Sequence, residues 1–336
     1  MKRTNIVIVC LLSLLLSACS EAKSGTQTSS KTEKKKELNV PIFSEDSAMI
    51  YLHKQCTFGP RVPNTAAHKS CGKYIANELE RHGAKVEKQE TELKAFDGTM
   101  LNACNIIGKY NPESKTRVAM FAHWDCRPFS DEEHDSKSKL MPVMGANDAA
   151  SGVAVLLEVA RLLNEVDPGI GVDLVMLDAE DYGAPDWAGI SDDDKTWCLG
   201  TQYWAQNTGY TDNKPQWGIL LDMVGGKNPN FAVDVISSQF AAGLSSQIWQ
   251  EAKKLGFGNI FVNEMGGSII DDHYFINQMT GIPTVDIIDY KQYSGFPEEW
   301  HTQKDTEDNI DKNTIGVVGR TIVNFLYKWA DKNVKE

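Results

Sequence analysis

The sequence predicts an α/β fold, a single domain with a mostly parallel mixed central β-sheet and helices on both of its faces. Short apolar runs of strand length alternate with longer segments of helical periodicity from Ser44 onward. No repeat or internal linker interrupts this alternation. The chain has 336 residues, of which 41% are hydrophobic and 24% are charged, so it has enough apolar material for one large domain.

The first elements are a helix and two strands. The helix begins at residue 64 or 65, where Asn and Thr are good N-caps, and ends at Arg81, before Gly83. Residues 84–93 alternate polar and apolar side chains, which is typical of a half-exposed strand. Residues 102–110 follow as a second strand.

The centre of the chain is a βαβ unit. Residues 117–125 and 172–181 are apolar runs that end in polar residues, and a helix that starts near Asp148 lies between them. Two strands joined by such a crossover helix are parallel, and helices cover both faces of the sheet that they form. The later elements are two further runs of this kind and a long amphipathic helix: 216–226, 282–288 and 313–332.

The first forty residues are expected to be a processing signal and a tether. Residues 1–18 have a basic start, a short apolar stretch and small residues before Cys19, and Leu-Ser-Ala-Cys (16–19) resembles a bacterial lipobox. The resemblance implies cleavage before Cys19 and acylation of that residue; the alternative is an uncleaved membrane anchor. Residues 19–40 then tether the domain 41–336 to the bacterial cell envelope, facing the periplasm and favouring the outer membrane.

Composition limits the partners and the role of the cysteines. A net charge of −12 argues against a nucleic-acid partner and against binding of anionic lipid, so membrane contact is expected only through the anchor. No two of the cysteines beyond Cys19 have the spacing of a zinc knuckle, and their odd number cannot pair completely. A disulfide between Cys56 and Cys71 is one possibility. These cysteines are Cys56, Cys71, Cys104, Cys126 and Cys198.

Acidic residues gather where the predicted strands end and where the central helix begins. In open α/β sheets, ligands bind beyond the carboxyl ends of the strands. Taken singly, Asp148 is explained as an N-cap, and the others by turn hydrogen bonds or solvation. Together, these carboxylates would repel one another unless a cation lay among them, which predicts a metal site with Asp148 as a ligand. The positions are His123, Asp125, Asp148, Asp178, Glu180, Asp181 and Asp222.

The remaining ligand is sought among the histidines. His301 lies in a polar loop ahead of the last helix and has the best context. One imidazole with two carboxylates and one open position is a composition found in catalytic zinc sites. The others are expected to be exposed, capping, loop or helix-start residues: His53, His68, His82, His134 and His273.

Short motifs occur in the order and approximate spacing of the zinc aminopeptidase superfamily. They are HWD (123–125), GANDAASG (145–152), LDAED (177–181), LLDMVG (220–225), DDHYF (271–275) and WHT (300–302). Their details resemble its animal-type glutaminyl cyclase branch, here as a bacterial lipoprotein, and the resemblance covers nearly the whole chain from Ser44. It implies one zinc ion per chain, held by Asp148, Asp181 and His301, with Glu180 as general acid and base. Asp181 stands where many relatives have Glu, which affects the geometry of the ligand rather than its ability to bind zinc.

Other positions bear on the choice between a cyclase and a two-metal peptidase. His123 and Asp222 are of the residue types that hold a second zinc in the peptidases, so they do not exclude that alternative. Asp271 stands where peptidases commonly carry Ser, and it resembles a cyclase carboxylate that shares a hydrogen bond with the partner at Asp222. Such a pair shares a proton and is a poor cradle for a second cation. The resemblance also implies apolar pocket walls, although each Trp could instead be core or rim packing: Trp187, Trp300, Phe296 and Ile269.

The expected function is that of a glutaminyl-peptide cyclotransferase. N-terminal Gln of peptides and proteins, and more slowly N-terminal Glu, would become pyroglutamate with release of ammonia. Glu180, Asp222 and Asp271 would form the catalytic set, and zinc would be the Lewis acid. We expect a monomer that acts on peptides with N-terminal Gln. The alternatives are a di-zinc aminopeptidase and a non-catalytic, receptor-like member of the superfamily.

Overall fold

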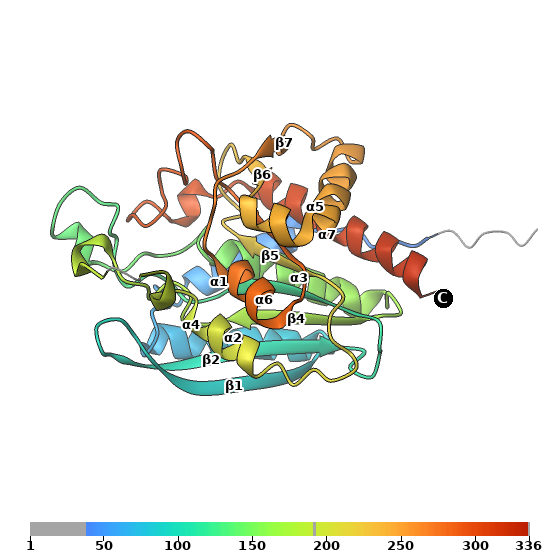
Figure 1. Cartoon of the computed structure of the whole chain (residues 1–336), viewed down its shortest axis with the longest axis horizontal. Coiled ribbons are helices and arrows are strands. Elements are labelled where there is room, and N and C mark those ends of the chain that lie inside the picture. The colour runs from blue at the N-terminus through green and yellow to red at the C-terminus, as the bar shows by residue number, and fades with distance from the viewer. Residues whose placement is uncertain (1–37, 191–192, 335–336) are drawn as a thin grey trace, which may run out of the picture. The chain divides into compact units, whose positions relative to one another are not determined.

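A six-stranded sheet with the order β1-β2-β4-β3-β5-β8 is the centre of the computed structural model, which describes residues 38–190 and 193–334 (Figure 1). The pairs β3–β4, β3–β5 and β5–β8 are parallel, whereas β1–β2 and β2–β4 are antiparallel. The predicted fold class, with a mostly parallel mixed sheet, is confirmed. The strands are β1 (Lys85–Lys94), β2 (Met100–Tyr110), β3 (Arg117–His123), β4 (Gly171–Leu177), β5 (Gly218–Asp222) and β8 (Thr284–Ile288).

Helices cover both faces of this sheet. Alternate side chains of β3 show the division: Met120 and Ala122 belong to the larger apolar core, and Phe121 belongs to a second one on the other face. The larger core contains side chains of α1, α2, α3, α5 and α7, and the second core contains side chains of α4 and α6. The helices are α1 (Glu45–Cys56), α2 (Ala66–Arg81), α3 (Ala150–Glu165), α4 (Leu199–Gln206), α5 (Val235–Lys254), α6 (Asp272–Thr280) and α7 (Lys312–Asn333).

Local sequence signals explain most helix starts. Thr65 is the N-cap of α2, and its hydroxyl accepts from the amide of His68 at 3.2 Å, as the sequence predicts. Asp234 and Asp311 cap α5 and α7 in the same way. A short parallel pair, β6 (Phe231–Val233) and β7 (Phe261–Met265), lies outside the main sheet and was not predicted.

The start of α3 differs from the capping hypothesis for Asp148. The N-cap of α3 is Ala149, without a side-chain capping bond, so the Asp148 carboxylate is not used to begin the helix. Close packing at Gly152 explains why the residues at the start of α3 are small. A Cβ atom at Gly152 would lie 2.2 Å from the carbonyl oxygen of Leu221, so the first turn of α3 packs directly against the backbone of β5.

Two expectations about single residues are wrong. His68 is buried rather than exposed or capping, and its Nε2 contacts Asp178 at 2.8 Å. The possible disulfide between Cys56 and Cys71 is not formed, since both are free and buried. Over the described ranges, no helix combines the length and apolar character needed to cross a membrane. The predicted signal sequence and Cys19 lie outside those ranges.

Candidate active site

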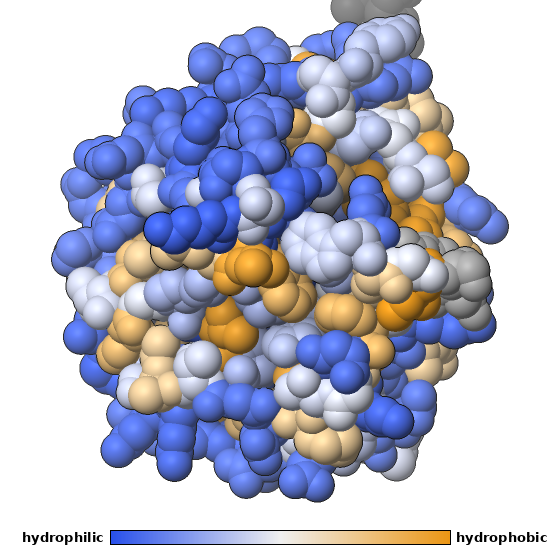
Figure 2. All heavy atoms as spheres, turned by 90° about the vertical axis from the view of Figure 1, so that its left-hand side faces the viewer, coloured by the Kyte–Doolittle hydropathy of each residue, from blue (hydrophilic) through white to orange (hydrophobic). Residues whose placement is uncertain are grey.

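The predicted convergence of acidic residues occurs at the carboxyl ends of the central strands. His123 ends β3, Asp222 ends β5, and the loop 178–181 follows β4. Asp148 joins them from the loop before α3, and His301 joins them from the loop before α7. Figure 2 shows the face that these loops form, where apolar side chains are exposed in the middle and hydrophilic ones surround them.

Asp148, Asp181 and His301 form a compact set of possible metal ligands. One ligand atom of each lies within 4.8 Å of the others, and all three residues are buried. His301 Nε2 lies 3.2 Å from Asp181 Oδ1 and 3.7 Å from Asp148 Oδ2. Burial, reinforced by the charge of Asp148, raises the pKa of Asp181 to about 6. Burial lowers the pKa of His301, but Asp181 and Asp131 together outweigh it and raise that pKa to about 9. The carboxylates therefore need a positive charge between them, which a divalent cation supplies.

The imidazole of His301 is oriented from behind. Its Nδ1 lies 3.2 Å from Asp131 Oδ1, which leaves Nε2 facing Asp148 and Asp181. A carboxylate behind a histidine ligand is the usual way in which proteins fix its tautomer and ring direction. Arg127 is fully buried, and it donates to Asp131 at 2.7 Å and to the carbonyl oxygen of Asp181 at 2.9 Å. One guanidinium thus links two of the three ligand positions.

The loop that carries Asp148 is fixed from two sides. Asp305 accepts the backbone amides of Asn147 at 2.7 Å and of Asp148 at 3.0 Å. Buried Arg61 donates to the carbonyl oxygens of Met144 and Gly145. The peptide bond between Asp148 and Ala149 is cis. Sequence reasoning missed the supporting residues Arg61, Arg127, Asp131 and Asp305, since single charged residues in loops carry no local pattern.

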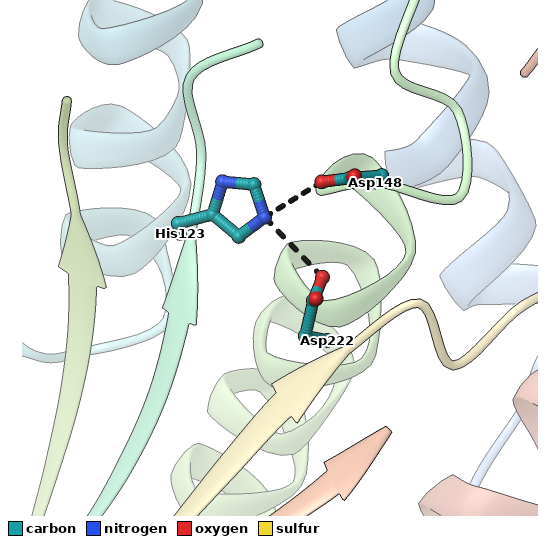
Figure 3. A group of neighbouring side chains, drawn as sticks. All are labelled: His123, Asp148 and Asp222. Atoms are coloured by element: carbon teal, nitrogen blue, oxygen red, sulfur yellow. Dashed lines mark hydrogen bonds and ion pairs between the residues drawn. The ribbon is translucent and has the colours of Figure 1, made fainter. Parts of the chain in front are cut away.

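A second possible ligand set shares Asp148 with the first. Figure 3 shows the ring of His123 between the carboxylates of Asp148 and Asp222, with its Nε2 2.9 Å from Asp148 Oδ1 and 3.2 Å from Asp222 Oδ1. Ligand atoms of these three residues also lie within 4.8 Å of one another. Burial, together with the charge of Asp148, raises the pKa of Asp222 to about 7. The residue types for a second metal are therefore present and close together.

Glu180 lies beside both ligand sets and belongs to neither of them. Its Oε1 accepts a hydrogen bond from the thiol of Cys198 at 3.2 Å, and its Oε2 lies 3.8 Å from Nδ1 of His123. Burial, opposed by His123 and reinforced by Asp181 and Asp271, raises the pKa of Glu180 well above its usual value. A carboxylate with a raised pKa next to a metal site is suited to accept and return a proton.

Asp271 is brought to the same place and lines the same pocket as Asp222 and Glu180. It is the N-cap of α6 and accepts the amide of Asp272 at 2.5 Å. Burial, then the charge of Asp271, raises the pKa of Asp286 on β8 well above its usual value. Asp222 contacts Nε2 of His123, and the charge of Asp271 helps to raise the pKa of Asp222. The hydrogen bond that the resemblance implies between Asp222 and Asp271 stays a prediction.

A pocket of about 160 Å³ opens onto these groups. Trp300, Phe296 and Ile269 line it. The ring of Trp300 stacks on that of His301 with centroids 3.8 Å apart, and Phe296 packs on Trp300 at 4.4 Å. A larger groove of about 820 Å³ between α2 and the β1–β2 hairpin contains none of these residues.

The remaining aromatic wall is Trp197 rather than Trp187. Trp197 lines the pocket, and its ring is parallel to that of His301 at 6.0 Å. Trp187 does not line this pocket; it is 49% exposed and packs edge-on against Phe129. Sequence reasoning chose Trp187 because it follows the acidic pair closely. No local signal in the sequence distinguishes Trp197 from Trp187.

Residues 105–326 match peptidase family M28. The chain belongs to peptidase family M28. The fold agrees with this assignment. A crystal structure of Bacteroides thetaiotaomicron glutaminyl cyclase bound to N-acetylhistamine is 50% identical, with a TM-score of 0.84 over 86% of this chain and 99% of that chain. A leucine aminopeptidase precursor from the same organism matches with the same identity, coverage and TM-score.

Two curated relatives carry the same two kinds of name. Aminopeptidase YwaD of Bacillus subtilis is 25% identical over 88% of this chain and 60% of its own length. Glutaminyl-peptide cyclotransferase of Boiga irregularis is 27% identical over 68% of this chain and 66% of its own length. The chain thus spans about three fifths to two thirds of the length of these relatives.

Proposed function

We propose that this M28 protein is a zinc-dependent glutaminyl-peptide cyclotransferase. It converts N-terminal Gln, and more slowly N-terminal Glu, into pyroglutamate. The observation that carries the proposal is the small aromatic-walled pocket, in which Glu180 and Asp271 stand beside the Asp148–Asp181–His301 set. A pocket of about 160 Å³ suits one side chain rather than a long substrate. The 50% identity to a solved glutaminyl cyclase supports the same conclusion.

The donor set suits one zinc ion per chain. Two carboxylates and one imidazole, from Asp148, Asp181 and His301, leave one coordination position for substrate. When bound there, zinc supplies Lewis-acid polarisation of the amide carbonyl of the substrate. Asp131 and Arg127 support the set by orienting His301 and by binding the backbone of Asp181.

Glu180 carries the proton transfers. Its carboxylate accepts a proton from the α-amino group, so that the nitrogen lone pair attacks the γ-carbon and a ring C–N bond forms. Glu180 then returns the proton to the side-chain nitrogen, the old C–N bond breaks, and ammonia leaves. Asp222 and Asp271 border the same pocket and orient the amide. N-terminal Glu reacts more slowly because water or hydroxide must leave from its carboxyl group.

The aromatic walls favour ring closure over hydrolysis. Trp300, Phe296 and Trp197 surround the space beside His301 and keep water from the reacting carbon. Holding the α-amino nitrogen near its own γ-carbon turns the reaction into a favoured intramolecular step. Water is not consumed in this reaction, so a dry pocket does not slow it.

The test offers two substrates to the purified soluble domain. A peptide with N-terminal Gln and an unblocked Leu-arylamide are compared, with ammonia release, arylamine release and bound zinc as the measurements. We expect ammonia release with one zinc ion per chain. Arylamine release without ammonia, with two zinc ions per chain, would overturn the proposal.

A di-zinc aminopeptidase is the second candidate function. The specific observation that favours it is the compact set of His123, Asp148 and Asp222, which could hold a second ion. The similarity to aminopeptidase YwaD points the same way. The comparison of ammonia and arylamine release decides between the two reactions.

We also propose that acylated Cys19 anchors the protein in the bacterial cell envelope. The lipobox-like residues 16–19 support this, and the excess of acidic residues gives the domain no affinity of its own for anionic lipid or nucleic acid. We propose a monomer. Cys19→Ala should abolish labelling by radioactive fatty acid and release active protein from membranes. Unchanged membrane retention would show that the apolar start is an uncleaved anchor.

A further inference from the structure

Cys198 is fully buried beside the proposed base and has no role in the ligand sets described above. Its Sγ lies 3.2 Å from Oε1 of Glu180. Within the described ranges, this thiol is the side chain that donates a hydrogen bond to the Glu180 carboxylate. The other carboxylate oxygen, Oε2, lies 3.8 Å from Nδ1 of His123, which is too far for a hydrogen bond. Ligand-type atoms of Glu180, Cys198 and Asp271 also lie within 4.8 Å of one another. The thiol is therefore part of the wall that surrounds the base.

The backbone fixes the thiol relative to Glu180. The amide of Cys198 donates to the carbonyl oxygen of Glu180 at 2.9 Å, and the amide of Leu199 donates to that of Ala179 at 3.0 Å. A Cβ atom at Gly200 would lie 1.9 Å from the carbonyl oxygen of Asp178. The first turn of α4 is thus packed directly on the loop that carries the base.

The conformation of Cys198 itself is unusual for its residue type. It is the N-cap of α4 and has a φ of 52°, in the left-handed region that side-chain-bearing residues rarely adopt. A non-glycine residue persists there only where surrounding contacts hold it. The two backbone hydrogen bonds to Ala179 and Glu180 are such contacts. They keep the thiol aimed at the carboxylate.

The thiol of Cys198 keeps its proton and can therefore donate a hydrogen bond. Burial, reinforced by the nearby carboxylates of Glu180 and Asp272, raises the pKa of Cys198 well above its usual value. A thiol is a weak donor, but here the geometry leaves it one acceptor oxygen on the neighbouring carboxylate.

We propose that Cys198 is a positioning residue for Glu180. Its thiol donates to Oε1 and so restricts rotation of the carboxyl group, which keeps this carboxylate at the pocket wall in position to accept a proton from the α-amino group of the substrate. This inference rests on the proposed function, because the reaction that Cys198 would affect is the proposed one. A purely structural role for Cys198 would instead change stability and leave turnover per folded molecule unchanged.

The kinetic test compares three variants of the soluble, zinc-loaded protein. Cys198→Ala removes the donor, and Cys198→Ser restores one. Cys71→Ala is the matched control, since Cys71 is an equally buried thiol in the apolar core on α2. We expect Cys198→Ala to lower kcat about tenfold, which is within the range for the loss of one hydrogen bond, with KM and zinc content unchanged. Cys198→Ser should recover most of kcat, and Cys71→Ala should keep wild-type kcat. Wild-type kcat in Cys198→Ala would overturn the inference.

A spectroscopic test does not depend on which reaction is catalysed. The S–H stretching band of Cys198 in the Raman spectrum is assigned as the band that Cys198→Ala or Cys198→Ser removes. Because a hydrogen bond weakens the S–H bond, we expect this band to move to higher frequency in Glu180→Ala. A band that stays in place would show that the thiol does not donate to Glu180.

The two proposals fail in different ways. If the wild-type protein releases no ammonia but hydrolyses the Leu-arylamide, the cyclase proposal fails. The kcat comparison is then made on the arylamide, because Glu180 occupies the position of the base in either reaction. The positioning role fails only if Cys198→Ala matches the wild type on the substrate that is turned over, or if the Raman band does not move.

Discussion

Glu180 and Asp181 are neighbours in the chain, yet the proposed function gives them different tasks, and separate substitutions test this. Asp181 Oδ1 lies 3.2 Å from Nε2 of His301, in the set that also contains Asp148. Glu180 is outside that set and accepts the thiol of Cys198 instead. We therefore predict that Glu180→Gln abolishes turnover but keeps the metal, whereas Asp181→Asn loses the metal.

The magnitudes follow from what each change removes. Gln keeps the size of Glu180 and an oxygen that can accept the thiol, but it cannot take a proton from the substrate. General base catalysis contributes about 10²–10⁴ in rate, so kcat should fall at least about a hundredfold, which is about 2.7 kcal/mol in activation free energy. KM should change only about two- to threefold, because the pocket walls are untouched.

Asp181→Asn removes one of two anionic ligands while keeping the shape of the side chain. Loss of a group that merely orients a ligand lowers metal affinity about 10- to 100-fold, so loss of a ligand charge should lower zinc affinity by at least about a hundredfold. Zinc binding stabilises the folded state, so the variant should also melt at a lower temperature than the wild type at equal total zinc.

The assay measures zinc per chain by chelator competition, and kcat and KM by ammonia release from a peptide with N-terminal Gln. Thermal unfolding with and without added zinc gives the contribution of the metal to stability. Zinc loss in Glu180→Gln together with zinc retention in Asp181→Asn would refute the reasoning, because ligand and base would then be reversed.

Three further predictions concern the support of the site and the stability of the fold. Asp305→Ala frees the backbone amides before α3, and we expect about 10- to 100-fold weaker zinc binding by chelator competition; unchanged affinity would show that the loop is rigid without it. Asp289 is buried, and burial raises its pKa from 3.8 to about 6, so ionisation in the folded state lowers stability as pH rises from about 4 to above 6. Asp289→Asn should therefore match the wild type near pH 4 and exceed it by up to about 3 kcal/mol at pH 7 in urea unfolding, and a pH-independent difference would contradict this. Gly152→Ala places a Cβ atom 2.2 Å from a carbonyl oxygen of β5, and we expect the free energy of unfolding to fall by about 1–3 kcal/mol. A fall of less than about 0.5 kcal/mol, which is typical of surface substitutions, would argue against close packing there.

The sequence by itself determined the main elements and the edge of the sheet where the site lies. Apolar periodicity is a local property, so it identified β3, α3, β4, β5 and β8 without knowledge of their partners. The carboxyl ends of parallel strands share one edge, so polar residues at the ends of separate runs could be placed together before any contact was known. This argument brought Asp148 together with the carboxylates after β4 and β5, and the resemblance to the zinc aminopeptidase superfamily then implied the set of Asp148, Asp181 and His301. One ligand atom of each lies within 4.8 Å of the others.

Only the tertiary structure decided what surrounds that set. The path of the loop after β4 places Trp197 in the pocket and Trp187 outside it, and no periodicity in a loop encodes that choice. Asp131, Arg127 and Cys198 contact His301, Asp181 and Glu180, respectively. Such contacts join residues that are far apart in the chain; Asp131 and His301, for example, are about 170 positions apart. They depend on how loops close over the sheet. The ends of the predicted strands therefore located the site and the family resemblance named its expected metal ligands, whereas loop geometry selected the groups that surround them.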